Sequence, residues 1–137
     1  MRFSPYAERM EKRARAESLS EKFSRWSAIL LLPAWAGVIG GELGPAAGEP
    51  HFWDKALHFT AYFVLSALAV MALAASKRAL WAMLGLIVMG AVLEAVQGMI
   101  GRDVSALDEL ANSLGVIGGA ATAWAITALL VRLRSAD

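Results

Sequence analysis

The chain has no cysteine, little charge and no recognisable hydrolase motif. Because cysteine is absent, the chain can form no disulfide, no thiolate nucleophile and no cysteine-based metal site. Charged residues make up only 18% of the 137 residues, and the net charge of +1 is uninformative because the charges are segregated along the chain. No HExxH zinc motif is present and no serine stands in a nucleophile-elbow context, which disfavours metalloprotease and serine hydrolase chemistry.

Apolar residues, in contrast, are abundant. They make up 58% of the chain and give a mean hydropathy of +0.52, far from the average of soluble globular proteins. The length is that of one domain. These values predict an all-α integral membrane protein, a four-helix transmembrane bundle with a cytoplasmic N-terminal helix. We expect the spans at about residues 23–41, 53–75, 80–100 and 107–131.

The first 25 residues form a polar leader. Acids precede bases by four positions in pairs such as Glu8/Lys12, which favours an exposed helix. Ser18-x-x-Glu21 matches a capping box and predicts that a helix begins there and runs on into the bilayer. Since acids and bases alternate, the pattern favours a solvated cytoplasmic helix over a nucleic-acid-binding patch, and we expect no nucleic-acid partner.

The first span contains Pro33, which predicts a kink or an untilted pose because the span is short. A cleaved signal peptide is the alternative, since Ala34-Trp35-Ala36 resembles a small-x-small cleavage site. The long charged leader and the three later spans favour a retained anchor.

The positive charges predict the orientation. The leader has seven Lys/Arg residues, while the 77–78 loop and the C-terminal tail have two each, and only Lys55 and Arg102 remain for the other side. By the positive-inside rule both termini are cytoplasmic, and the 41–53 and 101–107 loops lie outside. The domain organisation is therefore a leader at 1–25, a four-span membrane domain at 26–132 and a cytoplasmic tail at 133–137.

Polar residues interrupt three spans near their outer ends. Glu94 follows the uncharged run from Ala79 to Leu93, and a charged group in hydrocarbon costs at least ~2.5 kcal/mol unless it has a partner or a wet cavity. At 1.5 Å per residue, His58 and Asn112 lie ~6 Å below their helix starts and Glu94 ~9 Å below its helix end, so they can meet at one depth. We expect one contiguous polar site, open to the outside and with Glu94 at its floor, formed by His58, Glu94, Arg102, Asp108 and Asn112.

The residue types suggest roles. The catalytic candidates are His58, Glu94 and Asp108, of which His58 and Glu94 would act as acid and base. The substrate-binding candidates are cations for an anionic head group and polar groups for orientation, namely Lys55, Tyr62, Gln97, Arg102, Ser105 and Asn112.

Structural explanations compete with these roles. Asp54 and Asp108 fit as helix caps or first-turn acids, and Lys55 could simply snorkel to the interface. Gln97 and Asn112 could join helices by hydrogen bonds, and Glu109 and Asp103 are expected to be solvated. A divalent cation could bind Asp54, Glu94, Asp108 and His58, but ligands from three helices cannot be established by spacing, so no metal site is predicted.

Three glycines suggest close helix packing. Gly115-x-x-x-Gly119 lies on the face that bears Asn112, where the lack of side chains would let another helix approach closely. Gly90, one turn before Glu94, could do the same on the third span.

The ordered polar residues resemble a known family. Asp54-Lys55-x-x-His58-Phe59-x-x-Tyr62, Glu94-x-x-Gln97 and Arg102-x-x-Ser105-x-x-Asp108-x-x-x-Asn112-x-x-Gly115 are similar to the pattern of the VanZ-like family of small bacterial membrane proteins. The similarity covers about residues 53–119, but Gly98-Met99-Ile100-Gly101 stands where the family often has an aromatic residue and a proline. The resemblance implies a multi-pass protein of the bacterial cytoplasmic membrane, linked in its namesake to glycopeptide (teicoplanin) tolerance. It implies no accepted reaction.

Three functional classes remain open. The first is an enzyme or binding site for a membrane lipid or lipid-linked envelope precursor. The second is a non-catalytic membrane module whose polar cluster locks the bundle or docks a partner. The third is a proton-coupled carrier, for which four spans without a repeat are few unless copies of the chain form a homo-oligomer. The sequence identifies no cofactor and does not decide whether the chain is an enzyme.

Overall fold

The structure is a computed structural model that describes residues 5–44, 51–102 and 104–135. Its elements within these ranges are four α-helices, which are α1 (Pro5–Leu43), α2 (His51–Ala72), α3 (Lys77–Met99) and α4 (Ala106–Ser135). All four are long and apolar enough to cross a membrane. The predicted all-α four-helix bundle is therefore confirmed, and the chain is a multi-pass membrane protein.

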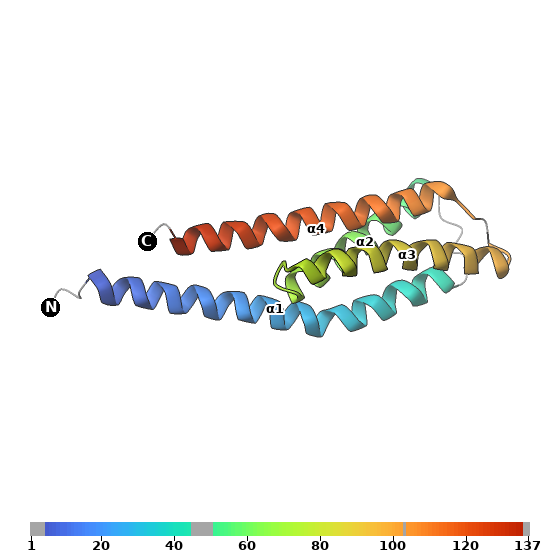
Figure 1. Ribbon diagram of the computed structural model, residues 1–137. Coiled ribbons are helices and arrows are strands. Elements are labelled where there is room, and N and C mark those ends of the chain that lie inside the picture. The colour runs from blue at the N-terminus through green and yellow to red at the C-terminus, as the bar shows by residue number, and fades with distance from the viewer. Residues whose placement is uncertain (1–4, 45–50, 103, 136–137) are drawn as a thin grey trace.

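The leader and the first span form one helix. The predicted helix start at Ser18 is wrong, because α1 begins at Pro5 and continues through this position without interruption. Good helix formers and acid–base pairs on both sides of Ser18 let the helix continue. Pro33 lies inside α1, and Figure 1 shows the axis of this helix bending along its course. At its other end α1 extends to Leu43, past the predicted end at Gly41.

The remaining helix ends lie close to the predicted ones. α2 stops at Ala72 rather than Ala75, because Ala74 and Ala75 adopt left-handed backbone conformations with φ of 50° and 53°. The connection from α3 to α4 is short and turns at Gly101, where φ is +83°. Helix α4 begins at Ala106.

Helix α2 packs along α4 through two glycines. A Cβ at Gly115 would overlap the carbonyl oxygen of Phe59, and one at Gly119 would lie 2.9 Å from the carbonyl carbon of Phe63. Because only glycine fits there, the backbones of the two helices approach closely. The Ser66 hydroxyl adds a hydrogen bond of 2.7 Å to the carbonyl of Val116. The predicted close contact at the Gly115/Gly119 face thus lies within the chain.

The apolar side chains divide between core and periphery. Tyr62, Leu65, Leu86 and Val116 form one buried cluster, against which α1 packs Leu31, Ala34 and Val38. A second cluster joins Val70, Ala79, Ala120 and Ala123. Large apolar side chains also cover much of the outer surface, as expected for helices that face lipid.

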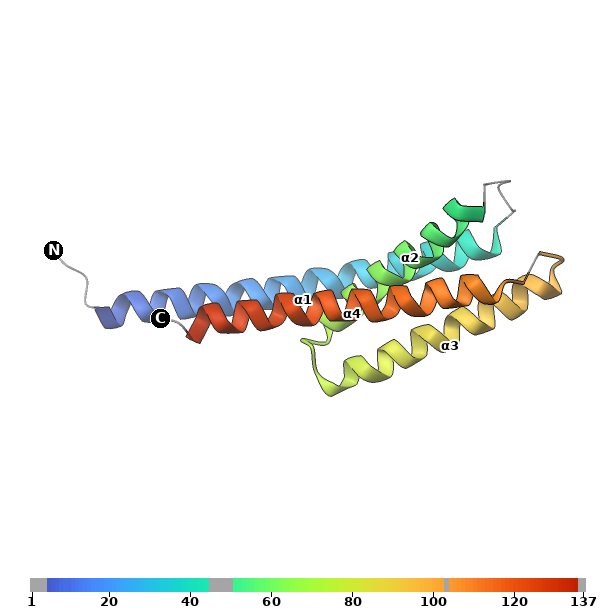
Figure 2. The same cartoon turned by 90° about the horizontal axis from the view of Figure 1, so that it is seen from above.

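The ends of the bundle differ in chemistry. Figures 1 and 2 show the beginning of α1 and the end of α4 projecting at the same end of the molecule. At the opposite end, α1 and α3 finish while α2 and α4 begin. We call this the polar end, because it holds the first turns of α2 and α4 and the last turns of α1 and α3, with their acidic, basic and amide side chains.

Candidate functional site

The polar end gathers the residues that the sequence analysis selected. Lys55 and His58 come from the first turns of α2, Glu94 and Gln97 from the last turns of α3, and Asp108 and Asn112 from the first turns of α4. His58, Glu94, Gln97, Asp108 and Asn112 are all buried. Side chains from different parts of the chain therefore lie at a similar depth along the antiparallel helices.

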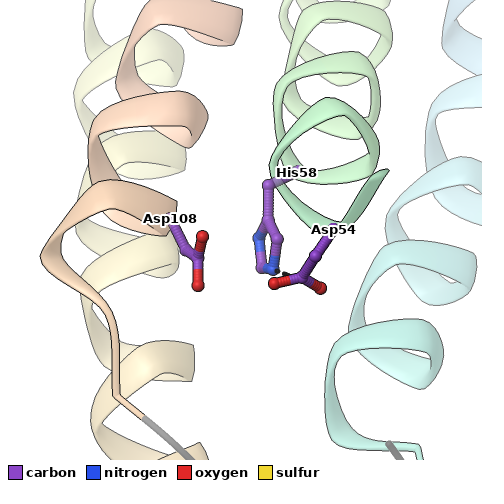
Figure 3. A group of neighbouring side chains, drawn as sticks. All are labelled: Asp54, His58 and Asp108. Atoms are coloured by element: carbon purple, nitrogen blue, oxygen red, sulfur yellow. Dashed lines mark ion pairs between the residues drawn. The ribbon is translucent and has the colours of Figure 1, made fainter. Parts of the chain in front are cut away.

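An ion pair and a histidine connect α2 to α4. The Lys55 Nζ donates to Asp108 Oδ1 at 2.9 Å, so this lysine is paired within the chain. One turn further along α2, His58 Nε2 lies 3.9 Å from Asp54 Oδ1. Figure 3 shows the His58 ring between Asp54 of its own helix and Asp108 of α4. Both aspartates belong to the first turns of their helices, where the helix dipole favours an acid.

The other ring nitrogen of His58 faces two acceptors. Its Nδ1 lies 3.1 Å from Asn112 Oδ1 and 3.4 Å from Glu42 Oε1. The amide of Asn112 donates through Nδ2 to Glu109 Oε2 at 3.4 Å, which agrees with its oxygen facing His58. A proton on Nδ1 satisfies this arrangement and leaves the lone pair on Nε2.

Glu42 is a candidate site residue that the sequence analysis missed. It was assigned to the 41–50 loop, yet it lies in the last turn of α1 and is only 8% exposed. Its two carboxylate oxygens are buried and have no hydrogen-bond partner among the described residues. A signal was present, because Ala34, Val38 and Glu42 follow each other at intervals of four on one helix face. That face is the one that packs on the core.

Arg102 and Gln97 hold the end of α1. Arg102 Nη1 donates to the carbonyl oxygens of Glu42 at 2.5 Å and Gly44 at 3.0 Å, and the Gln97 amide donates to the Glu42 carbonyl at 2.7 Å. The last carbonyls of a helix lack partners within the helix, and a cation there also favours the dipole. Arg102 was expected to bind an anionic head group, but it is half-buried and its Nη1 is engaged with α1.

Glu94 is held by a backbone group. Its Oε1 accepts a hydrogen bond from the N–H of Ser105, just before α4, while its Oε2 is buried without a hydrogen-bond partner among the described residues. No hydrogen bond or ion pair joins Glu94 to Arg102 or His58 among the described residues. Ser105 therefore contributes through its main chain rather than through its hydroxyl.

Gly90 makes room for polar side chains rather than for a helix backbone. A Cβ there would lie 2.6 Å from Glu109 Oε2, 3.1 Å from Asn112 Nδ2 and 3.3 Å from the Tyr62 hydroxyl. The expectation that Glu109 is solvated is wrong, because its carboxylate is half-buried and accepts hydrogen bonds from Asn112 and Ser113. Tyr62 is fully buried and its hydroxyl lacks a hydrogen-bond partner in the described chain. Asp103, which was also expected to be solvated, lies outside the described residues.

A cavity of about 460 Å³ lies beside the cluster, between α1 and α2. Its polar part is lined by Glu42, Asp54, His58 and Arg102, and its longer apolar part by residues such as Gly37, Val38, Leu57, Ala61 and Val64. The expected site at spans two, three and four is thus displaced toward α1. Of the five residues expected to form it, His58 and Arg102 line this cavity. Asp108 and Asn112 lie beside His58 but do not line the cavity, and Glu94 does not line it either.

Comparisons of the chain with protein-family models, with curated proteins and with solved structures gave no match. The side chains themselves define what the site can bind. Both cations, Lys55 and Arg102, are already engaged with groups of the chain, whereas the carboxylate of Glu42 is not hydrogen-bonded to any described residue. The lining of the cavity therefore offers carboxylate acceptors, one imidazole and an apolar surface.

Proposed function

We propose that this chain binds the head group of a membrane lipid or lipid-linked envelope precursor in the cavity between α1 and α2, at the outer face of the bacterial cytoplasmic membrane. The observation that carries the proposal is the position of Glu42. The Glu42 carboxylate is buried, its Oε1 lies 3.4 Å from His58 Nδ1, and its Oε2 has no hydrogen-bond partner among the described residues. A buried carboxylate with an unsatisfied oxygen is costly, so its position beside the cavity favours a ligand that supplies donors or positive charge.

The shape of the cavity supports a lipid-like ligand. The apolar lining from Gly37 to Val64 suits an acyl or polyprenyl chain, and the polar lining around Glu42 and His58 suits a head group. The polar and apolar parts of the cavity follow one another along the axes of α1 and α2. A lipid in a bilayer would lie in the same direction. Lys55 and Arg102 act as supporting residues in this proposal because both are engaged with the chain.

The resemblance to the VanZ-like family supports the link to the cell envelope. Of its motif residues, Asp54 and His58 line the polar part of the cavity, and Asp108 and Asn112 lie beside His58. We therefore extend the proposal to glycopeptide tolerance: expression of this chain in a susceptible bacterium is expected to raise tolerance to teicoplanin. The Glu42→Gln variant is expected to lose this effect at unchanged expression.

The cavity itself can be tested with two glycines. Gly37 lines the cavity, and a Cβ there meets nothing within 4 Å, so Gly37→Leu is expected to fill the apolar channel without a clash. Gly85 of α3 offers the same free space but does not line this cavity, so Gly85→Leu is the matched control. Native mass spectrometry of the protein from detergent is expected to show retained lipid for the wild type and Gly85→Leu, and less for Gly37→Leu. Equal retention in all three would reject a lipid site in this cavity.

A non-catalytic structural role is the second candidate, and one observation favours it. Lys55, Gln97 and Arg102 join separate helices through hydrogen bonds and an ion pair, as a cluster that locks a bundle would. In that case Gly37→Leu would leave lipid retention unchanged, whereas Arg102→Gln would lower the melting temperature. The unpartnered Oε2 of Glu42 beside the cavity favours the binding site, because a locking cluster gains nothing from an unsatisfied oxygen.

A further inference from the structure

Negative charge is in excess at the polar end. Among the described residues, Lys55 pairs with Asp108, and Arg102 donates to main-chain oxygens instead of carboxylates. Burying carboxylates without compensating positive charge is unfavourable, so the cluster calls for a further cation. The carboxylates described at this end are those of Glu42, Asp54, Glu94, Asp108 and Glu109.

Three of the polar side chains are arranged as ligands. Asp54, His58 and Asp108 each offer one atom, and these atoms all lie within 4.8 Å of one another. The 3.9 Å between His58 Nε2 and Asp54 Oδ1 is too long for a hydrogen bond. Two ligands of one tetrahedral Zn²⁺ at 2.0–2.2 Å from the metal lie about 3.3–3.6 Å apart, so Asp54 and His58 would need to approach by only a few tenths of an ångström to share an ion. Figure 3 shows the imidazole and both carboxylates converging.

The surroundings of His58 prepare its free nitrogen for a metal. Asn112 Oδ1 and Glu42 Oε1 both face Nδ1, so the proton belongs on that nitrogen. The lone pair then lies on Nε2, which is 3.9 Å from Asp54 Oδ1. Metal-binding histidines typically donate their other N–H to a carboxylate or carbonyl in this way. Glu42 adds a second indication, because its carboxylate is nine-tenths buried and lines the same cavity as Asp54 and His58, while its Oε2 has no hydrogen-bond partner among the described residues.

We propose that Asp54, His58 and Asp108 form a binding site for one divalent transition-metal cation. The imidazole favours an ion such as Zn²⁺ over Mg²⁺ or Ca²⁺, which prefer oxygen ligands alone. Asp108 can keep its ion pair with Lys55, since a carboxylate has two oxygens. Three protein ligands leave a coordination position for a further group, and Asp54 and His58 open onto the cavity.

The cation would define the head group that the cavity accepts. Arg102 lines the cavity, but its Nη1 donates to main-chain oxygens of α1, and Lys55 pairs with Asp108. A phosphate-bearing head group would therefore lie beside the carboxylates of Glu42 and Asp54, and a metal ion between them would offset this repulsion. The site therefore points to a phosphate-bearing lipid, bound through the cation. This last link rests on the proposed function, whereas cation binding does not.

The test is calorimetric titration of Zn²⁺ into the full-length protein in detergent, after removal of metal with a chelator. One saturable site per chain is expected for the wild type. His58→Gln and Asp108→Asn are close in size to the native side chains and are expected to lose saturable binding. The chain has two histidines, so His51→Gln is the matched control and is expected to bind as the wild type does.

Two results would overturn the cation site. One is the absence of saturable binding to the wild type. The other is binding that persists in both His58→Gln and Asp108→Asn, which would place the ion elsewhere. If these variants do not fold, a second measurement uses Co²⁺ added to the wild-type protein. Ligation of Co²⁺ by nitrogen and oxygen is expected to give visible absorption bands that Zn²⁺ removes. The absence of these bands would equally reject the site. Since no lipid is needed in these measurements, their outcome is independent of the Gly37→Leu experiment.

Discussion

At the scale of single residues, Glu94 shows how a carboxylate is kept inside an apolar helix. The residue is only 6% exposed, and one of its oxygens accepts the N–H of Ser105 at the start of α4. A main-chain donor cannot move away as a long side chain can, so this hydrogen bond fixes the distance between the end of α3 and the start of α4. The carboxylate thereby shapes the polar end without touching the cavity.

This role predicts different effects for two substitutions of Glu94. Glu94→Gln keeps an oxygen for Ser105 and is expected to melt close to the wild type in detergent. Glu94→Leu leaves the Ser105 N–H without its acceptor, and an unsatisfied buried donor costs about 1–3 kcal/mol, so its melting temperature is expected to fall. A Leu variant as stable as the wild type would show that the hydrogen bond contributes nothing to the fold.

The sequence predicts part of the site because helices have a fixed rise. Depth along each helix places His58 and Asn112 at one level, and in the structure they lie in contact. Depth says nothing about which acceptor a side chain selects, so the contact of Glu94 with the main chain of Ser105 was not predicted. Glu42 was missed because glycines around it suggested a loop, although in a membrane the helix continues to satisfy its own backbone groups.

At the scale of the helices, the approach of α4 to α2 depends on two positions without a side chain. Gly115→Ala places a Cβ against the main chain at Phe59 and Phe63, which cannot move as a side-chain tip can. Overpacking of this kind typically costs about 1–3 kcal/mol, so a clearly lower melting temperature in detergent is expected.

Gly85→Ala is the control for this substitution. Its Cβ would meet nothing within 4 Å, and alanine favours a helix over glycine by about 1 kcal/mol, so its melting temperature is expected to stay the same or rise. If Gly115→Ala behaved like Gly85→Ala, the two helices would be separated by more than the structure shows.

The helices themselves were predictable because apolar runs of sufficient length have few alternatives in a membrane. Their ends were less predictable. The end of α2 at Ala72 depends on left-handed conformations at two alanines, where glycine would be the usual signal. The start of α1 at Pro5 shows that a capping motif such as Ser18-x-x-Glu21 does not begin a helix when the preceding residues are helical as well.

At the scale of the whole molecule, the arrangement of the helices constrains the topology. The start of α1 and the end of α4 project at the same end of the bundle, and the α2–α3 connection lies toward that end, away from the polar end. Lys77 and Arg78 of this connection and the basic leader thus belong to one side. By the positive-inside rule we predict that this side faces the cytoplasm and that the polar end and its cavity face outward.

Single cysteines test this orientation directly, since the chain has none of its own. Ser76 lies in the exposed α2–α3 connection and Val104 in the exposed α3–α4 connection, so neither substitution should disturb packing. A membrane-impermeant maleimide added to spheroplasts is expected to label Val104→Cys at once, and Ser76→Cys only after the membrane is permeabilised. The same two variants in detergent are expected to react equally, which controls for local accessibility. The opposite order in spheroplasts would place Glu42, His58 and the cavity on the cytoplasmic side, where no envelope precursor exposed to glycopeptides could reach them.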